Sequence, residues 1–582
     1  MSAGSRGRRP AAGRRGGRHW LGRAVGVGGH TAGVDGRIRL LRLAFIVFLV
    51  LIGGKAVAVA STSENLSRMA LEQQTAELVL PAHRGAILDR NGQELAVGKP
   101  QQTVFATPYL LDDPEAAALA LCRALQIDRK KERRAVIAAL SRRGSGFAYV
   151  ARKVDPELAQ AARALDLPGV GTYDEEERTY PMQGSAAQVL GFAGVDNQGL
   201  AGIELAYDEQ LSGEAGSEVV VRDPAGRTLK TVRQAPPVPG ADVRLTIDEN
   251  IQYTAEDVLA RAVRDSHAKA AVAIVMDPRT GEVLAMANVP KVKGNVFKNS
   301  PSERNRAVTD VYEPGSIFKL VTISGALADD LVRPTTKFTL PPTLTLEDRT
   351  INESHPRGTV VYTVREILQW SSNVGAVKIG IKMGKQSLAE WIDAFGFGEP
   401  TGIEFPGEAG GIVLPADQWS GTTIVNVPMG QGIAVTPIQM AAAFAAVAND
   451  GVAVEPRLVA QVGETVSGAS KEHRVIPARV AREVRSMLAT AVAEGTGTKA
   501  QIPGYEVAGK TGTAEKPLPG GGGYSTSNYV ASFIGMVPAD HPRLVVMVAV
   551  DEPHTSIYGG DIAAPAVREI MLFALRHLEI AP

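Results

Sequence analysis

The chain has 582 residues, 45% of them hydrophobic and 21% charged, so it can bury a large core and is not disordered as a whole. Its length predicts two or three domains, and its net charge of zero, with a mildly acidic body behind an arginine-rich start, argues against nucleic-acid binding. The single cysteine, Cys122, excludes an intrachain disulfide, and the nine histidines show no metal-ligand spacing, so we expect neither a metal ion nor a cofactor.

The N-terminal part predicts a membrane anchor. Residues 1–37 are rich in glycine and arginine, which is typical of a disordered tail. An apolar stretch follows, and residues 38–60 are close to the ~20 residues that span a bilayer. The arginines before it place the tail in the cytoplasm and the rest outside. Ala58-Val59-Ala60 resembles a signal-peptidase site, but the long tail before it favours an uncleaved anchor.

The next region, residues 61–235, is expected to form a mixed α and β domain. A helix continues the anchor, and Asp89-Arg90-Asn91-Gly92 then predicts a turn between two strands. Arg178 and Glu204 are interpreted as structural ion-pair partners. Recurring alanine, leucine and charged residues predict three helices, at 113–126, 130–142 and 156–165. Alternating apolar and polar residues predict a hairpin at 216–231.

The last region, residues 236–582, begins after a proline-rich linker at 235–240. Helix and strand signals alternate in it, so it belongs to the α+β class. A glycine-rich segment, 519–523, predicts a mobile loop. The expected amphipathic helix is 248–266, and the expected strands are 243–247, 270–277, 282–287, 505–508 and 544–550.

The strongest functional signal lies in Tyr312–Leu320, where a Pro-Gly turn opens into an apolar helix. Ser316 would lie in its first turn and Lys319 one turn later on the same face. A buried lysine has a lowered pKa, and its neutral amine can take a hydroxyl proton. The pattern predicts a nucleophilic serine with a lysine base. A second Ser-x-x-Lys begins at Ser266, closes a polar helix end and is interpreted as solvated surface.

Two further motifs follow in the chain, Ser371-Ser372-Asn373 and Lys510-Thr511-Gly512-Thr513. The three together form the signature of serine β-lactamases and penicillin-binding proteins. With the segment Arg84–Gly92, they make the chain resemble a class B penicillin-binding protein over roughly residues 40–580. Asn373 and the segment Tyr529–Asp540 resemble the division-specific (septal) branch of that family.

The resemblance implies an α+β architecture with one N-terminal transmembrane helix. An elongated pedestal (dimerisation-type) domain would occupy 61–235. A penicilloyl-serine transferase domain, serine β-lactamase-like, with an antiparallel sheet and a helical subdomain, would occupy 236–582. The implied protein is a single-pass enzyme of the bacterial cell membrane that cross-links peptidoglycan stem peptides in septal wall synthesis and is inhibited covalently by β-lactams. Implied partners are a septal glycosyltransferase and other division proteins.

The same resemblance implies roles for individual residues. Ser316, Lys319 and Ser371 would be catalytic, with Ser371 passing a proton to the leaving group. The backbone N–H groups of Ser316 and Thr513 would form an oxyanion hole. Asn373 would bind a substrate amide, and Lys510 would supply positive charge near the substrate carboxylate. The full expected substrate-binding set is Asn373, Lys510, Thr511, Gly512 and Thr513.

Other readings of the motifs stay open. A D,D-carboxypeptidase or a β-lactamase would use the same site with water as acceptor, and an elongation- or sporulation-specific transpeptidase would share every motif. A transmembrane sensor would need a cytoplasmic effector or several spans, whereas this chain offers a short tail and one span. A catalytically silent scaffold would not need all three motifs intact.

Overall fold

The computed structural model describes residues 32–142, 144–182, 184–222, 228–292, 303–346, 349–518, 520 and 522–582. The chain divides into two compact units, Met1–Ala76 and Glu77–Pro582, and each is described by itself. Helix α1 (Ala32–Gln74) makes up nearly all of the described part of the first unit.

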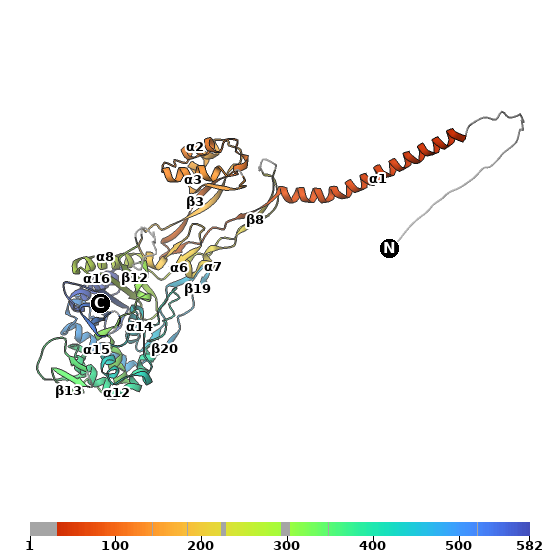
Figure 1. Ribbon diagram of the computed structural model, residues 1–582. Helices are drawn as coiled ribbons and strands as arrows, with labels where there is room; N and C mark the ends of the chain where they lie inside the picture. The colour runs from red at the N-terminus through yellow and green to blue at the C-terminus, as the bar shows by residue number, and fades with distance from the viewer. Residues whose placement is uncertain are drawn as a thin grey trace, which may run out of the picture. The chain divides into compact units, whose positions relative to one another are not determined.

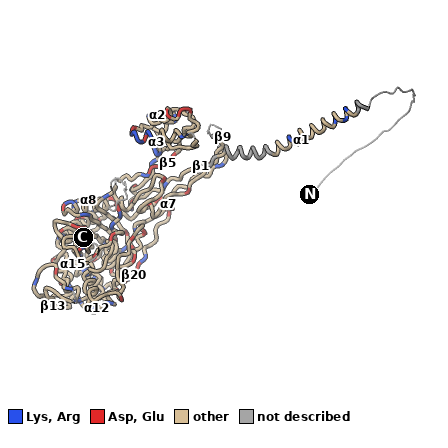
Figure 2. The backbone as a smooth tube through the Cα atoms, in the orientation of Figure 1, with Lys and Arg blue, Asp and Glu red and all other residues tan. Residues whose placement is uncertain are grey.

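Helix α1 is long and apolar enough to cross a membrane. Its candidate span, Gly36–Ser61, has a mean hydropathy of 2.5 and is not covered by other parts of the protein. Basic residues lie mainly at its N-terminal end, before the uncharged stretch (Figure 2). The helix continues through residues 61–74, as expected for a juxtamembrane extension. Residues 32–37 are helical as well, so the prediction of a disordered tail is wrong for them, and residues 1–31 lie outside the described residues.

Strand β1 (Thr75–Leu80) leads into the second unit, and the predicted β-hairpin of β2 (Ile87–Leu88) and β3 (Glu94–Ala106) follows. The carboxylate of Asp89 closes its turn by accepting hydrogen bonds from the backbone N–H groups of Asn91 and Gln93, at 2.7 and 2.8 Å. Strand β3 also pairs with β4 (Ala148–Val154) and β5 (Val170–Thr179). Three helices close a small core over this sheet and confirm the predicted ones: α2 (Pro114–Ala124) and α3 (Lys130–Leu140), both labelled beside β3 in Figure 1, and α4 (Pro156–Arg163).

A fully buried carboxylate, Glu204, ties this region together. Its two oxygens accept hydrogen bonds from Nε of Arg178 at 2.6 Å and from Nε of Arg84 at 2.7 Å. The predicted pairing of Arg178 with Glu204 is confirmed, and Arg84 is an additional partner. Because a buried charge is costly unless it is paired, this cluster is structural. The neighbouring elements are α5 (Ala187–Leu190), β6 (Phe192–Ala193), β7 (Gly199–Ala201), α6 (Gly202–Ala206) and α7 (Asp208–Ser212).

The predicted hairpin at 216–231 is formed by β8 (Gly216–Arg222) and β9 (Thr228–Ala235), and its turn, 223–227, lies outside the described residues. The proline-rich segment after it is docked on the protein instead of hanging free. The backbone of Val238 exchanges two hydrogen bonds of 2.9 Å with that of Glu214. Strand β10 (Val243–Leu245) then pairs in parallel with β2 and antiparallel with β18 (Val459–Val462), so one sheet crosses the expected domain boundary.

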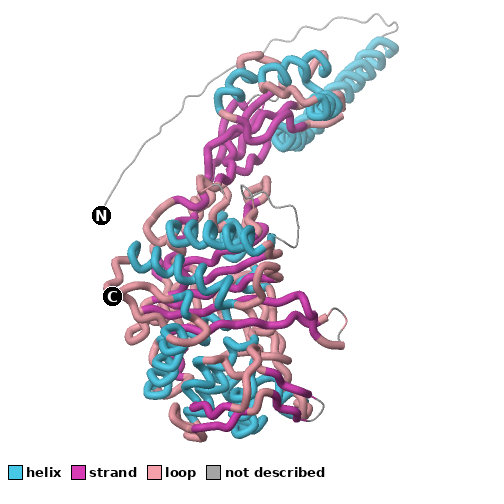
Figure 3. Tube along the Cα trace, turned by 90° about the vertical axis from the view of Figure 1, so that its left-hand side faces the viewer, coloured by secondary structure: helices cyan, strands magenta, loops and turns pink. Residues whose placement is uncertain are grey.

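The C-terminal region is built on a five-stranded antiparallel sheet in the order β12-β11-β23-β22-β21. The side chains of β11 alternate between two hydrophobic cores, one on each face. Helices α8 (Glu249–Ser266) and α16 (Gly559–His577) cover one face, and the helical subdomain covers the other (Figure 3). The strands are β11 (Ala270–Met276), β12 (Val283–Val289), β21 (Ala508–Pro517), β22 (Tyr524–Val537) and β23 (Leu544–Asp551).

The helical subdomain carries most of the remaining elements. Its helices are α9 (Arg306–Thr309), α10 (Lys319–Ala328), α11 (Val364–Gln369), α12 (Asn373–Ala394), α13 (Thr423–Asn426), α14 (Pro437–Ala448) and α15 (Ala478–Ala493). Its short strands include β13 (Lys337–Leu340), β14 (Thr343–Leu346), β15 (Arg349–Asn352) and β16 (Val360–Thr363).

The sequence expectations for this region hold with three exceptions. The strand predicted over 243–247 ends at Leu245, so that prediction is wrong for its last two residues. Strand β21 begins only at Ala508, so the strand predicted from residue 505 is wrong for its first three residues. Ser266 is buried and donates a hydrogen bond to the carbonyl oxygen of Ala262 at 2.6 Å, so it is not solvated surface, although Lys269 is exposed. Of the glycine-rich loop, Pro519 and Gly521 lie outside the described residues.

Candidate active site

Ser316 lies on a tight turn that opens helix α10 and packs against strand β21. It belongs to a 3-10 turn, η4 (Gly315–Phe318), that leads directly into α10. Gly315 has φ +56°, and a Cβ atom there would lie 3.1 Å from the carbonyl oxygen of Thr513 on β21. A glycine is therefore needed for the turn to approach the strand this closely. As a result, the Ser316 hydroxyl lies beside the edge of the sheet.

Lys319 is fully buried one turn further along. Its Nζ lies 3.0 Å from Oγ of Ser316 and 3.3 Å from Oγ of Ser371. It also donates to two groups that can only accept, the carbonyl oxygen of Ser371 and Oδ1 of Asn373, both at 2.7 Å. A neutral amine that donates its two hydrogens to these acceptors has its lone pair left to accept a proton from a serine hydroxyl.

The electrostatics of Lys319 suit a general base. Burial lowers the pKa of its ammonium group to about 7, and the negative charge of Glu353 acts weakly in the opposite direction. A base with a pKa near the working pH, within hydrogen-bond distance of a hydroxyl, is placed to remove the hydroxyl proton. The predicted pairing of Ser316 with a buried lysine is therefore seen in the geometry.

The Ser371-Ser372-Asn373 motif forms the corner between α11 and α12. Ser371 adopts φ +58°, and the hydroxyl of Ser372 caps α12 by accepting from the N–H of Gly375 at 3.0 Å. Because of this turn, the side chains of Ser371 and Asn373 both reach Lys319.

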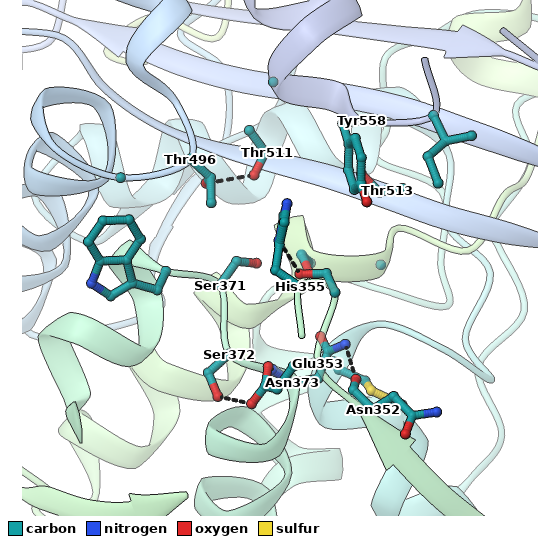
Figure 4. A pocket seen from close by; sticks show the side chains of 18 of the residues that line it. Asn352, Glu353, His355, Ser371, Ser372, Asn373, Thr496, Thr511, Thr513 and Tyr558 are labelled. Carbon is teal, nitrogen blue, oxygen red and sulfur yellow. Dashed lines mark hydrogen bonds between the residues drawn. The ribbon is translucent and has the colours of Figure 1, made fainter. Parts of the chain in front are cut away.

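Glu353 supports the same corner, and the sequence analysis missed it. Its carboxylate accepts from the Ser372 hydroxyl at 2.6 Å (Figure 4) and from the backbone N–H of Asn373 at 2.8 Å. It also pairs with Arg357. It lies outside every motif, just after the short strand β15. Only its burial and its partners in space reveal its place.

The Lys-Thr-Gly-Thr motif occupies β21, so its side chains alternate between two directions. A Cβ atom on Gly512 would lie 2.2 Å from Oγ of Ser532 and 3.2 Å from Ile317, so this glycine allows the strand to pack against the serine turn. Thr511 and Thr513 face the cleft. The Thr511 hydroxyl forms a 2.9 Å hydrogen bond with that of Thr496, a second residue that the sequence analysis missed.

Lys510 is fully buried beneath this strand, and its Nζ donates to the carbonyl oxygen of Thr511 at 3.2 Å. Burial lowers the pKa of its ammonium group well below the usual value, and the charge of Lys319 lowers it further. The expected role of Lys510 as a positive charge beside a substrate carboxylate stays a prediction.

All eight predicted residues meet at one cleft of about 770 Å³. Ser316, Ser371, Asn373, Thr511 and Thr513 line it, Lys319 and Lys510 lie behind its wall, and Gly512 lies in the strand that forms its edge. Figure 4 shows the Ser371–Asn373 corner facing Thr511 and Thr513 across the opening. No group of three or more histidine, cysteine or acidic side chains in the described parts of the chain is arranged to hold a metal ion.

Comparison with known proteins supports this arrangement. Residues 271–572 match the penicillin-binding protein transpeptidase domain, and residues 79–245 match the penicillin-binding protein dimerisation domain. "Stage V sporulation protein D" of Bacillus subtilis is 35% identical over 93% of this chain and 86% of its own length. "Peptidoglycan D,D-transpeptidase FtsI" of Escherichia coli is 34% identical over 86% of this chain and 84% of its own.

Solved structures agree. Penicillin binding protein 3 of Mycobacterium tuberculosis, complexed with aztreonam, superposes with a TM-score of 0.69 at 30% identity, covering 87% of this chain and 98% of that one. Fold and cleft together define a serine acyltransferase of the penicilloyl-serine transferase class. The chain belongs to the class B penicillin-binding proteins. The fold class and the enzyme class predicted from the sequence, a D,D-transpeptidase of this family, are confirmed.

Proposed function

We propose that this protein cross-links peptidoglycan stem peptides through an acyl-enzyme on Ser316. The observation that carries the proposal is the contact of a fully buried Lys319 with both serine hydroxyls and with Asn373. The family match and the names of the relatives support peptidoglycan as the substrate. The resemblance to class B penicillin-binding proteins implies the reacting part, the D-Ala-D-Ala end of a stem peptide.

In the first half-reaction, Oγ of Ser316 attacks the carbonyl carbon of the penultimate D-Ala while its proton moves to Nζ of Lys319. The tetrahedral intermediate then expels the last D-Ala. Its departing amine takes a proton from the Ser371 hydroxyl, which regains one from Lys319 across the 3.3 Å contact. An ester on Ser316 and free D-alanine result.

In the second half-reaction, an amine of a neighbouring stem attacks the ester. Lys319 takes the proton that this amine loses, and the proton returns to Oγ of Ser316 as the ester breaks. The new amide is the cross-link, and the enzyme is regenerated. Charge on the carbonyl oxygen would be stabilised by the N–H groups of Ser316 and Thr513, which the close approach of Gly315 to Thr513 brings near each other.

The remaining roles follow from the cleft. Asn373 would hold a substrate amide, and Thr511, Gly512 and Thr513 would hold the terminal carboxylate, with Lys510 supporting them from behind. β-Lactams would acylate Ser316 as mimics of the dipeptide. The domain limits we propose are a tail at 1–37, an anchor at 38–60, a pedestal at 61–235 and a transpeptidase domain at 236–582.

We place the enzyme in a bacterial cell membrane with its N-terminus in the cytoplasm and its cleft outside. The arginines before α1 support this orientation. A septal role, with a septal glycosyltransferase and other division proteins as partners, rests on the division-type sequence motifs. A role in sporulation is the second candidate, because one relative is a stage V sporulation protein.

Intact mass of the full chain in detergent, followed for hours after mixing with benzylpenicillin, tests the proposal. We expect one adduct, on the Ser316 peptide, that persists and is absent from Ser316→Ala. Rapid loss of the adduct with drug turnover would instead show a β-lactamase. An adduct on the folded alanine variant would overturn the assignment of the nucleophile.

A further inference from the structure

The cleft contains one carboxylate without a counter-ion. Of its three acidic residues, Glu353 pairs with Arg357, and Asp561 accepts from Lys499 at 2.7 Å. The third, Glu515, has no salt-bridge partner within the described part of the chain.

Arg349, the remaining arginine that lines the cleft, contacts other groups instead of Glu515. Nη2 of Arg349 donates to Gln431 at 3.1 Å, and its guanidinium lies 5.6 Å from the centre of the Tyr524 ring. Lys516, next in sequence to Glu515, donates to Asp551 and Glu552 at 2.7 and 2.6 Å. Glu515 therefore keeps its negative charge free for a ligand.

Glu515 extends the row of side chains that faces the substrate. It lies on β21 two residues after Thr513, so it points to the same side as Thr513 and Thr511. Two residues of a strand span about 6.6 Å, which is also the length of two residues of an extended peptide.

One tyrosine ring, Tyr529, lies beside this carboxylate, and Tyr558, whose ring stacks on that of His355, lies beside Tyr529. Tyr529 is the β22 partner of Glu515, and both Tyr529 and Tyr558 line the cleft. Burial raises the pKa of the Tyr529 phenol, and the charges of Glu515 and Tyr558 raise it further, as expected for close neighbours. A carboxylate beside an aromatic ring favours an ammonium group, which gains from the negative charge and from the ring face together.

The direction of the substrate follows from the proposed function, on which this inference rests. The terminal carboxylate lies at Thr511 and Thr513, and the scissile carbonyl lies at Ser316. A donor peptide extended along β21 then runs from its C-terminus at Thr511 toward Glu515. The residue before the D-Ala pair, the third of the stem, lies two residues or about 6.6 Å from the C-terminal one, which puts it opposite the stretch between Thr513 and Glu515 and brings Glu515 within reach of a long side chain.

We propose that Glu515, with the ring of Tyr529, binds an ammonium group on the third residue of the donor stem. The site then takes donors with a cationic diamino acid at that position in preference to neutral or acidic ones.

Matched donors test the proposal directly. A tripeptide of Nα-acetylated L-lysine before D-Ala-D-Ala is compared with the same peptide acetylated on the lysine side chain as well, using the full chain in detergent and release of D-alanine as readout. We expect kcat/KM to favour the free amine about tenfold, and Glu515→Gln to reduce that preference to about one. Glu494→Gln, an exposed carboxylate outside the cleft, is the control for the loss of one charge and should keep the preference.

Penicillins with one nucleus and different side chains give a second readout. Acylation of Ser316 should be fastest with ampicillin, which carries an ammonium, slower with neutral benzylpenicillin and slowest with carbenicillin, which carries a carboxylate. Glu515→Gln should compress these differences. If all three acylate the wild type equally and the variant changes nothing, the ammonium site is overturned while the acyl-enzyme stands. If none acylates the wild type, the proposed function fails as well.

Discussion

Two fully buried ionisable side chains, Glu204 in the N-terminal region and Lys319 behind the cleft wall, differ in their partners: Glu204 has counter-ions at hydrogen-bond distance, and Lys319 has none. Glu204 is held by two arginines at 2.6 and 2.7 Å. Lys319 contacts only neutral groups at hydrogen-bond distance, and its pKa falls to about 7. A buried charge with its counter-ions fixes a structure, whereas one without them becomes a base near neutral pH.

The largest expected effect comes from removing the unpaired amine. Lys319→Met keeps an unbranched side chain as far as Cε but takes away the amine that acts as base, so acylation of Ser316 should slow by about 100- to 10,000-fold. Stopped-flow with a fluorescent penicillin measures the rate. The melting temperature should stay the same or rise, because an apolar group replaces a buried amine. Near-normal acylation by this variant would show that another group takes the proton.

Removing the paired carboxylate should do the reverse. Glu204→Gln leaves Arg178 without a salt-bridge partner among the described residues, while Arg84 keeps Asp208, and the free energy of unfolding should fall by about 3–5 kcal/mol. Denaturant titration measures this loss, and the fraction that stays folded should acylate at the wild-type rate. Glu209→Gln, an exposed acid on the following helix, is the control and should change stability little. If Glu204→Gln left the free energy of unfolding unchanged, the stabilising role assigned to Glu204 would be wrong.

The pH dependence of acylation sharpens the comparison. Lys319 must be neutral to accept a proton, and its folded-state pKa is about 7, so the rate should rise as pH rises and level off above neutrality. Between pH 6 and pH 8 the neutral fraction, and with it the rate, should grow about tenfold. A midpoint near the ordinary lysine value of about 10 would show that the amine is solvated.

A smaller effect is expected from Glu353→Gln. The negative charge of Glu353 raises the pKa of Lys319, so its removal should move the midpoint of the pH profile below 7. Because the Ser372 hydroxyl and the Asn373 N–H also lose an ionised acceptor, the maximal rate should fall several-fold. Glu390→Gln, on the exposed side of α12, should leave both quantities unchanged. A drop in rate without a shifted midpoint would mean that Glu353 acts only by holding the corner.

The sequence predicted the parts of the site that local rules govern. The spacing of Ser316 and Lys319 follows from one helical turn, and the row of Thr511 and Thr513 follows from strand alternation. The sequence did not predict Glu353 and Thr496, because their hydrogen-bond partners lie on other elements that only tertiary packing brings near.

The same limit explains the errors in the fold. Residues 32–37 look like a glycine- and arginine-rich tail in composition, yet they begin the helix of the apolar stretch that follows. The composition of 235–240 also predicted a free linker. The prediction failed because the backbone of this segment forms hydrogen bonds with Glu214 and His83, and composition does not reveal such partners.

The sheet that crosses the expected boundary has a practical consequence. Strand β10 has β2 on one side and β18 on the other. A chain cut just before residue 236 would lose β2 and leave β10 as an open edge, with unpaired backbone groups that can recruit strands from other molecules. The two regions are therefore expected to unfold in one calorimetric transition, and an excised catalytic region should self-associate unless that edge is covered.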